Sequence, residues 1–262
     1  MDASTKSQQA FHDLPAVILA AGRGERLLGN TAGGLKPLTP LLGITLLERA
    51  LLACQTVGSL DCYIIVGYEQ ARLSAYIESL RCRYRMRLHA VFNPDWQEGN
   101  GTSVLAAAAY VQGPFLLLMC DHVFDTAILH SLIAAAQETT AACLLAVDLH
   151  IDAIFDLDDA TKVQLADSTI TAIGKDLTHF CAIDTGLFLC WPLLCQALRQ
   201  ARAAGDGSLS GGIRRLIATD RVQAVPIGDR FWMDIDTTES LLQAQQRLLA
   251  NLTTPGPCGQ TI

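Results

Sequence analysis

The sequence predicts a single α/β domain of Rossmann-like architecture, in which a mixed, mainly parallel sheet carries helices on both faces. Three observations support this fold class. Apolar runs of strand length alternate with helical patterns through the first half of the chain. A hairpin-like segment follows in the second half and makes the sheet mixed. The 262 residues are 50% hydrophobic, and no linker-like segment divides them into two domains.

The first half predicts five strands with four helices between them. The strands are expected from short apolar runs, and the helices from apolar residues near three- and four-residue spacing. The predicted strands are Ala16–Ala20, Cys62–Val66, Leu88–Phe92, Phe115–Met119 and Ala142–Val147. The predicted helices are Thr45–Thr56, Gln70–Cys82, Thr102–Val111 and Thr126–Thr139.

The second half predicts antiparallel strands and then further helices. The expected elements are a hairpin at Lys162–Ile173, a strand at Cys181–Leu189, helices at Pro192–Ala203 and Leu209–Ala218, a strand at Val222–Pro226 and a helix at Thr237–Leu249. We expect residues 15–250 to form the domain. Residues 1–14 and 251–262 are predicted to be flexible tails, the second because it is rich in Pro, Gly and Thr.

Composition restricts the possible partners and the location. The formal net charge of −7 argues against nonspecific nucleic-acid binding, which needs a basic face. The N-terminus has no apolar signal core, and the longest apolar stretch, Val104–Cys120, is interrupted by polar residues, Gly and Pro. Nine cysteines without a CxxC pair indicate buried free thiols and no zinc site. We expect a soluble cytoplasmic protein that does not insert into membranes.

A glycine-rich segment after the first predicted strand suggests a triphosphate site. Gly22 and Gly24 allow consecutive main-chain N–H groups to face one anion, and Arg26 and Lys36 add positive charge beyond them. Each cation alone fits a solvated surface residue equally well, but their joint placement favours phosphate. The segment lacks the Lys-Ser or Lys-Thr of a Walker loop, and Leu27 stands where a dinucleotide fingerprint needs its third glycine.

Two acidic segments suggest a metal site. Asp121 follows the fourth predicted strand, at the sheet edge where ligands bind in open α/β sheets. Asp234 and Asp236, two residues apart, point the same way in extended geometry and could reach one cation. Mg²⁺ takes one or two carboxylates and completes its shell with water and phosphate oxygens. Helix capping is the alternative for Asp121, although Asp125 is the better cap candidate for the helix that follows. Helix capping is also the alternative for Asp236, at the start of the last predicted helix.

Two further segments offer polar groups to a ligand. In the loop 93–103, Asn100, Thr102 and Ser103 offer donors and acceptors suited to a base edge, and Gly101 permits close backbone approach. A plain loop with a helix N-cap explains the same residues. Lys175, just after the hairpin, could hold a second phosphate or be an exposed turn lysine.

Together these segments resemble the nucleotidyltransferase family that joins a nucleoside triphosphate to a phosphorylated sugar or alcohol, the MobA-like NTP transferases. LAAGRGERL at 19–27 and LKPL at 35–38 match its signature. Within the family the chain looks most like the cytidylyltransferases that use CTP and inositol 1-phosphate. That likeness rests on EGNGTS at 98–103, MCDH at 119–122, GK at 174–175, DTGLF at 184–188 and WMDIDT at 232–237.

The resemblance implies a nucleotide-diphospho-sugar transferase fold and Mg²⁺-dependent formation of CDP-inositol and pyrophosphate. It assigns nucleotide binding to Leu19, Ala20, Ala21, Gly22, Gly24, Arg26, Lys36, Asn100, Gly101, Thr102 and Ser103. It assigns the acceptor substrate to Glu98, Lys175 and Asp184, the metal to Asp121, Asp234 and Asp236, and catalysis to Arg26, Lys36, Asp121 and Lys175. The insertion at 31–35 lengthens the loop before Lys36 relative to the family pattern.

Other functions remain open from the sequence. Phosphocholine, a sugar 1-phosphate or molybdopterin could replace inositol 1-phosphate as acceptor, and phosphocholine cytidylyltransferases share parts of the later segments. A catalytically inactive nucleotide-binding regulatory module is the alternative of another class, and a dehydrogenase is disfavoured by the broken fingerprint. Relatives often carry a fused membrane-embedded transferase, so we expect a separate membrane enzyme to use the product. A homodimer is a further possible assembly.

Overall fold

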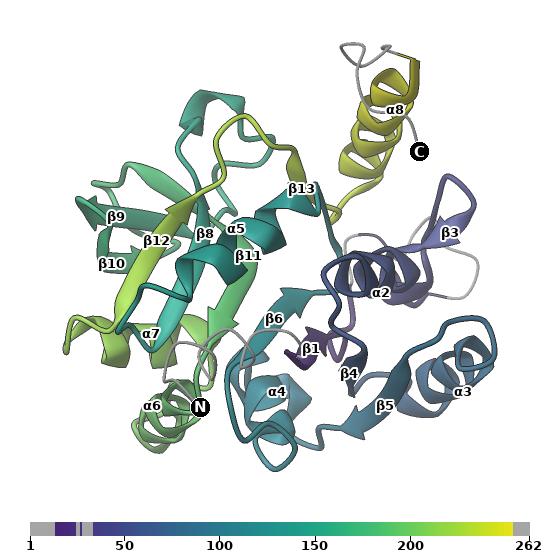
Figure 1. The fold of residues 1–262 in the computed structure, drawn as a ribbon, viewed down its shortest axis with the longest axis horizontal. Coiled ribbons are helices and arrows are strands. Elements are labelled where there is room, and N and C mark those ends of the chain that lie inside the picture. Colours follow the sequence, from purple (N-terminus) through teal and green to yellow (C-terminus); the bar gives the residue numbers. More distant parts are fainter. Residues whose placement is uncertain (1–13, 25–26, 28–33, 254–262) are drawn as a thin grey trace, which may run out of the picture.

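The centre of the molecule is a nine-stranded mixed sheet (Figure 1). The structure is a computed structural model that describes residues 14–24, 27 and 34–253. In spatial order the strands are β5 (Arg87–Phe92), β4 (Asp61–Val66), β1 (Ala16–Leu19), β6 (Phe115–Met119), β11 (Ala182–Cys190), β8 (Cys143–Asp148), β12 (Val222–Pro226), β10 (Thr169–Gly174) and β9 (Lys162–Ala166).

The strand directions confirm a mixed sheet in which most strands run the same way. β5, β4, β1 and β6 pair in parallel, and β8 and β12 do so on the other side of the sheet. β11 runs antiparallel to both β6 and β8 and therefore joins the two parallel groups. The predicted hairpin is β9 paired with β10. The carboxyl ends of β1 and β6 consequently lie side by side, which brings the glycine-rich segment next to Asp121.

Helices cover both faces of the sheet, as predicted. Neighbouring residues of β1 alternate between the faces, so that Ile18 belongs to one core cluster and Val17 to the other. The helices on the Ile18 face are α2 (Leu46–Thr56), α3 (Gln70–Leu80) and α5 (Ala127–Ala135). Those on the Val17 face are α4 (Asn100–Ala107), α6 (Leu193–Ala203) and α7 (Leu209–Ile217).

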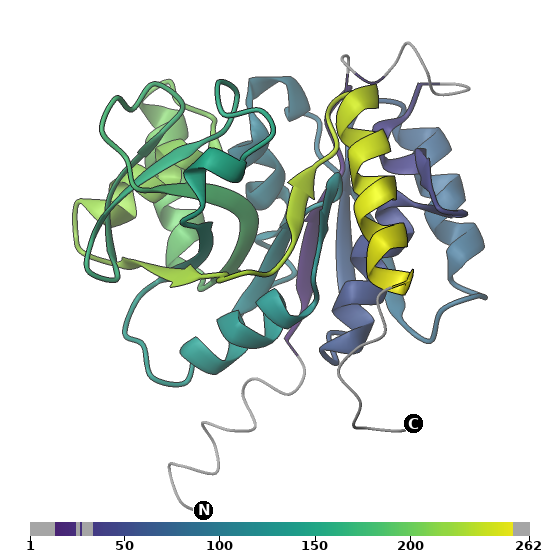
Figure 2. The same cartoon turned by 90° about the horizontal axis from the view of Figure 1, so that it is seen from above.

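A small two-stranded sheet and the last helix complete the domain. β7 (His122–Phe124) pairs antiparallel with β13 (Trp232–Asp234), and α8 (Thr238–Thr253) follows directly. Figure 2 shows α8 in yellow beside the purple and blue segments of the first half. Ala244 of α8 packs in one buried cluster with Leu41 and Leu46. The end of the chain thereby holds Asp234 and Asp236 close to the beginning.

Some boundaries differ from those predicted. α4 begins at Asn100 instead of Thr102, which puts Thr102 inside the helix. Leu14 was assigned to a flexible tail, but it is buried in the core, where its carbonyl accepts a hydrogen bond from Ser59 Oγ. α8 continues to Thr253, past the boundary predicted at residue 250. The remainder of both predicted tails, residues 1–13 and 254–262, lies outside the described residues.

Within the described part of the chain, every helix is too short or too polar to cross a bilayer.

Candidate functional site

The glycine-rich segment after β1 is fixed by hydrogen bonds to the neighbouring strand and its loop. The main-chain N–H of Ala20 donates to the carbonyl of Ile65 at 3.0 Å, and that of Tyr68 donates to the carbonyl of Ala21 at 2.9 Å. Leu19, Ala20 and Ala21 are therefore buried and have fixed positions. A Cβ at Gly22 would meet nothing within 4 Å, so there is open space beside its main chain. Arg26 lies outside the described residues.

Gly24 is required by its backbone conformation and by its neighbour. Its φ is +63°, in the left-handed region that favours glycine. A Cβ at this position would also lie 2.6 Å from the Cβ of Lys36, which is closer than side chains can pack. The glycine thus lets the Lys36 stem pass directly over the loop. This contact links the glycine-rich segment to the acidic cluster.

Lys36 lies among the three predicted metal ligands. Its Nζ is 2.6 Å from Oδ2 of Asp121 and 3.5 Å from Oδ1 of Asp234, and it also pairs with Asp236. The side chain is only 6% exposed, so Lys36 is not a solvated loop lysine. Burial alone would lower the pKa of Lys36, but the three carboxylates outweigh burial and raise the pKa above its usual value. Lys36 is therefore a buried cation at this site.

The pairing of β7 with β13 brings the acidic groups together. Its register places Asp234 opposite His122, which follows Asp121 directly. The main-chain N–H of Ile235 donates to the carbonyl of Asp121 at 3.0 Å, and that of Cys120 donates to Leu19 at 3.1 Å. Asp121 is thus attached to β1 on one side and to β13 on the other. The predicted convergence of Asp121, Asp234 and Asp236 is what the structure shows.

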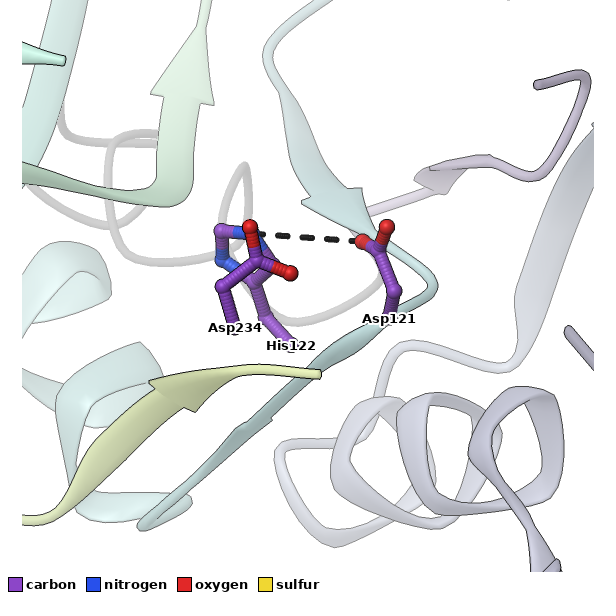
Figure 3. Close-up of side chains that lie close together, drawn as sticks. All are labelled: Asp121, His122 and Asp234. Carbon is purple, nitrogen blue, oxygen red and sulfur yellow. Dashed lines mark ion pairs between the residues drawn. The ribbon is translucent and has the colours of Figure 1, made fainter. Parts of the chain in front are cut away.

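His122 completes the cluster, although the sequence suggested no role for it (Figure 3). Its Nδ1 lies 2.6 Å from the carbonyl oxygen of Thr185. Its Nε2 lies 3.7 Å from Oδ2 of Asp234 and 3.9 Å from Oδ1 of Asp121. Burial would lower the pKa of His122, but Asp234 and Asp121 outweigh it and raise the pKa to about 9. Without a metal, the imidazole is a second cation beside Lys36.

The donor atoms fit a divalent cation. One ligand atom from each of Asp121, His122 and Asp234 lies within 4.8 Å of the others. Oδ1 of Asp234 is buried and makes no hydrogen bond with the described residues, apart from its ion pair with Lys36. Carboxylate oxygens are the ligands that hard cations prefer, and an oxygen of this kind gains a partner when a cation binds.

A cavity of about 320 Å³ opens beside the carboxylates, away from the glycine-rich segment. Asp121, Asp234 and Asp236 line it, whereas the segment 19–24 does not. Lys175 stands at the wall, half-exposed, with its Nζ 2.6 Å from Oδ1 of Asp159. The carboxylates thus lie between the glycine-rich segment and the cavity. The acidic cluster therefore contacts the glycine-rich segment through Lys36 and lines the cavity through its carboxylates.

The profile of the MobA-like NTP transferase domain matches residues 16–225. The chain belongs to this family. The match extends from β1 to β12 and includes the glycine-rich segment, Lys36, Asp121 and the hairpin. The nucleotidyltransferase interpretation of the sequence is therefore confirmed at the level of the family.

Similar proteins agree with the MobA-like assignment. The chain is 31% identical over 238 residues to the "Bifunctional IPC transferase and DIPP synthase" of Rubrobacter xylanophilus, a match that covers 89% of this chain and 52% of the relative. A protein of the same name from Aquifex aeolicus is 27% identical, with coverage of 89% and 51%. The chain spans about half the length of the curated relatives it matches.

A solved structure shares the fold. The inositol-1-phosphate CTP transferase from T. maritima superposes with a TM-score of 0.80 and 24% sequence identity, covering 94% of this chain and 99% of that structure. The superposition thus covers nearly all of both chains. The predicted nucleotide-diphospho-sugar transferase fold is confirmed.

Within the MobA-like domain, the polar residues at the start of α4 form hydrogen bonds with other parts of the protein. Asn100 lines the cavity, and its Oδ1 accepts a hydrogen bond from the main-chain N–H of Leu209. Thr102 and Ser103 are buried, and both hydroxyls accept hydrogen bonds from the side chain of Asn93. Both side chains therefore face the interior, and the contact of this segment with a base edge stays a prediction.

Gly101 and Glu98 also lie against other parts of the protein. A Cβ at Gly101 would lie 2.7 Å from the carbonyl of Gly207, so this glycine permits close packing of the loop against α7's N-terminus. The carboxylate of Glu98 lies 2.8 Å from a guanidinium nitrogen of Arg202, and Glu98 does not line the cavity. The structure therefore does not bring Glu98 to the acidic cluster.

Asp184 lines the cavity of the MobA-like domain. Its Oδ1 accepts a hydrogen bond from the main-chain N–H of Gly186 at 2.7 Å. Burial raises the pKa of Asp184 to about 6, although Gly186 and His122 act in the opposite direction. Asp148 and Trp232, which the sequence did not single out, meet in the same wall, where the Trp232 indole N–H donates to Asp148 at 2.8 Å. Trp232 and Asp148 are 84 positions apart in the chain, so no local sequence pattern predicts this contact.

Proposed function

We propose that the chain transfers a cytidylyl group from CTP to inositol 1-phosphate and releases CDP-inositol and pyrophosphate. The observation that carries the proposal is the acidic cluster with Lys36, which stands between the glycine-rich segment and the cavity. One side then accepts a triphosphate and the other a phosphorylated acceptor. The name of the T. maritima enzyme supports inositol 1-phosphate and CTP as the pair.

The proposed chemistry needs no side-chain base. A phosphate monoester is an anion at neutral pH, so its oxygen attacks the α-phosphorus of CTP directly. A bond forms between this oxygen and the α-phosphorus while the bond to the β-phosphate oxygen breaks, and pyrophosphate leaves with that electron pair. Positioning and charge neutralisation are then the main contributions to catalysis.

Each residue of the cluster has one proposed task. Asp121, Asp234 and Asp236 hold Mg²⁺, which when bound neutralises charge on the reacting phosphates. Lys36 and the amides near Gly22 stabilise the triphosphate and the departing pyrophosphate, together with Arg26. Lys175 and Asp184, which line the cavity, contact the acceptor. In the proposed complex, the Lys175 ammonium group exchanges its ion pair with Asp159 for an ion pair with the phosphate of the acceptor.

A substrate panel tests the proposal. The purified protein is incubated with Mg²⁺, each of the four nucleoside triphosphates and inositol 1-phosphate, phosphocholine, glucose 1-phosphate or molybdopterin, and pyrophosphate is measured. We expect CTP with inositol 1-phosphate to give the fastest release. A different best pair would reject the substrates and keep the reaction class. No release with any pair would favour an inactive regulatory module.

The proposal includes partners and location. The product is an activated alcohol, so the proposed consumer is a membrane transferase that uses CDP-inositol. A homodimer and a cytoplasmic location belong to the same proposal. Sedimentation of the purified chain tests the dimer, and fractionation of cells tests the location.

A further inference from the structure

His122 is held as the ligands of metal centres are held. Its Nδ1 lies 2.6 Å from the Thr185 carbonyl, and only an N–H can donate to a carbonyl oxygen, so this contact assigns a proton to Nδ1. Metal-binding histidines usually donate their second ring N–H to a carbonyl or carboxylate, which fixes the tautomer and the ring orientation. Nε2 is thereby the atom turned towards Asp121 and Asp234 (Figure 3).

The backbone of β11 is shaped around the imidazole. The pairing of β11 with β8 shifts in register between Asp184 and Phe188, at a bulge that contains Gly186 with φ +71°. A Cβ at Gly186 would lie 2.4 Å from two atoms of the His122 ring. The bulge supplies the Thr185 carbonyl, and the glycine supplies the space. Both features hold the ring in one orientation.

The spacing of the donor atoms suits one ion. Two ligands about 2.1 Å from an octahedral ion are about 3.0 Å apart when adjacent and about 4.2 Å apart when opposite. Nε2 of His122 lies 3.7 Å from Asp234 Oδ2 and 3.9 Å from Asp121 Oδ1, which is shorter than the longest separation that one ion can bridge. Both distances are too long for a good hydrogen bond. A bound ion would therefore draw the three groups into its own geometry.

We infer that Nε2 of His122 is a further protein ligand of the metal, beside the carboxylates of the cluster, and that this nitrogen gives the centre a preference for Mn²⁺ over Mg²⁺. Imidazole suits Zn²⁺, Fe²⁺ and Ni²⁺, whereas Mg²⁺ and Mn²⁺ both favour oxygen donors. As a first-row transition ion, Mn²⁺ nevertheless accepts an imidazole nitrogen more readily than Mg²⁺ does. Binding of the ion replaces the proton on Nε2, which passes to solvent. The inference rests on the proposed function for the presence of a metal, but its test does not depend on turnover.

Pulsed electron paramagnetic resonance of bound Mn²⁺ tests the inference. The full chain is labelled with ¹⁵N only in histidine and loaded with Mn²⁺ and CTP without an acceptor. We expect the coupling of a ¹⁵N nucleus to Mn²⁺ in the wild type and its loss in His122→Gln. Loss of even an outer-shell partner weakens metal binding about 10- to 100-fold, so His122→Gln should weaken Mn²⁺ by about tenfold or more. Mg²⁺ should be weakened less.

His150→Gln is the matched control. His150 is about half-exposed and contacts Asp148 at 3.2 Å, near the cavity but outside the cluster. This variant should keep the ¹⁵N coupling. Mn²⁺ bound without a histidine coupling, a coupling that persists in His122→Gln, or no Mn²⁺ binding at all would each overturn the inference. The labelled wild type decides even if His122→Gln does not fold. Failure of the proposed function would instead appear as absent pyrophosphate release in the substrate panel.

Discussion

The ammonium group of Lys36 lies 2.6 Å from a carboxylate oxygen of Asp121. The two residues come from segments that follow neighbouring parallel strands, because Lys36 follows the glycine-rich segment after β1 and Asp121 follows β6. Asp234 and Asp236 converge on the same ammonium group. The lysine therefore balances one of the three negative charges that gather there. A divalent cation would meet the same carboxylates, so Lys36 and a metal have overlapping electrostatic roles.

Replacing Lys36 by Met should destabilise the protein and slow turnover. Met keeps most of the buried aliphatic stem but leaves three carboxylates without their cation. Breaking a buried ion pair costs about 3–5 kcal/mol, and the partial exposure of the carboxylates reduces this to about 2 kcal/mol. Added Mg²⁺ should recover part of the loss. Urea unfolding with and without Mg²⁺ measures both effects, and pyrophosphate release should fall by about a hundredfold.

Lys175→Met is the control for the loss of a lysine. Lys175 is 54% exposed and pairs with Asp159, so its substitution should change the free energy of unfolding by about 0.5 kcal/mol or less. Mg²⁺ should not alter that small change. Equal destabilisation by the two substitutions would contradict the role given to Lys36.

The sequence predicted the sheet, its helices and the position of Asp121, because these depend on periodic patterns and on a regular topology. It could not predict the pairing of β7 with β13. Each of these strands has three residues, which is too few for a periodic pattern to be recognised. The two strands are also far apart in the chain. The sequence also gave His122 no role. The orientation of its ring depends on the bulge at Gly186, which no local sequence pattern predicts.

Polar residue type alone was a poor guide to contact. Thr102 and Ser103 were expected to face a base, but α4 starts earlier than predicted and turns them into the packed interior beside Asn93. Glu98 pairs with Arg202 of α6, a contact that depends on how two distant elements dock. The sequence also did not predict the surroundings of Lys36. This lysine was predicted near phosphate, and the structure shows that it is buried among carboxylates.

Asp121→Asn should leave a folded protein with turnover reduced at least about a hundredfold, because a neutral amide holds a cation poorly and no longer neutralises Lys36. Steady-state pyrophosphate release and circular dichroism measure activity and fold. Asp125→Asn is the matched control, since Asp125 accepts a hydrogen bond from the main-chain N–H of Ala127 at the start of α5. Turnover should be unchanged in this control. Near-normal turnover of Asp121→Asn would reject its assignment.

Gly24→Ala should reduce turnover through Lys36. The new Cβ would lie 2.6 Å from the Lys36 Cβ, and the positive φ adds strain of about 1–2 kcal/mol. Gly43→Ala carries similar strain, at φ +88°, but its Cβ would meet nothing within 4 Å. Gly43→Ala should therefore lose stability in thermal unfolding through strain alone and keep pyrophosphate release, whereas Gly24→Ala adds the clash with Lys36 and should lose more stability and pyrophosphate release. Parallel losses of activity would show that backbone strain alone explains the effect.

A buried polar network around Glu48 stabilises the first half of the domain. Glu48 is 2% exposed and accepts hydrogen bonds from the hydroxyls of Tyr76 at 2.6 Å and Tyr84 at 2.9 Å. It also caps α2 with Thr45 and pairs with Arg83 at 2.9 Å. Burial would raise the pKa of Glu48, but these hydrogen bonds outweigh it and lower the pKa below its usual 4.5. The carboxylate form therefore stabilises the folded state.

Glu48→Gln should lower the free energy of unfolding by about 2 kcal/mol at pH 7, because hydrogen bonds to a charged acceptor contribute about 1.5–3 kcal/mol. The folded-state pKa lies below the unfolded value, so this contribution is complete above pH 4.5 and is lost as the pH falls through the lowered pKa. The difference between wild type and variant in urea unfolding should therefore shrink below pH 4.5. Glu78→Gln, at a side chain that is 65% exposed, should change stability by about 0.5 kcal/mol or less at either pH. A difference for Glu48→Gln that stays constant with pH would mean that packing, not charge, explains the loss.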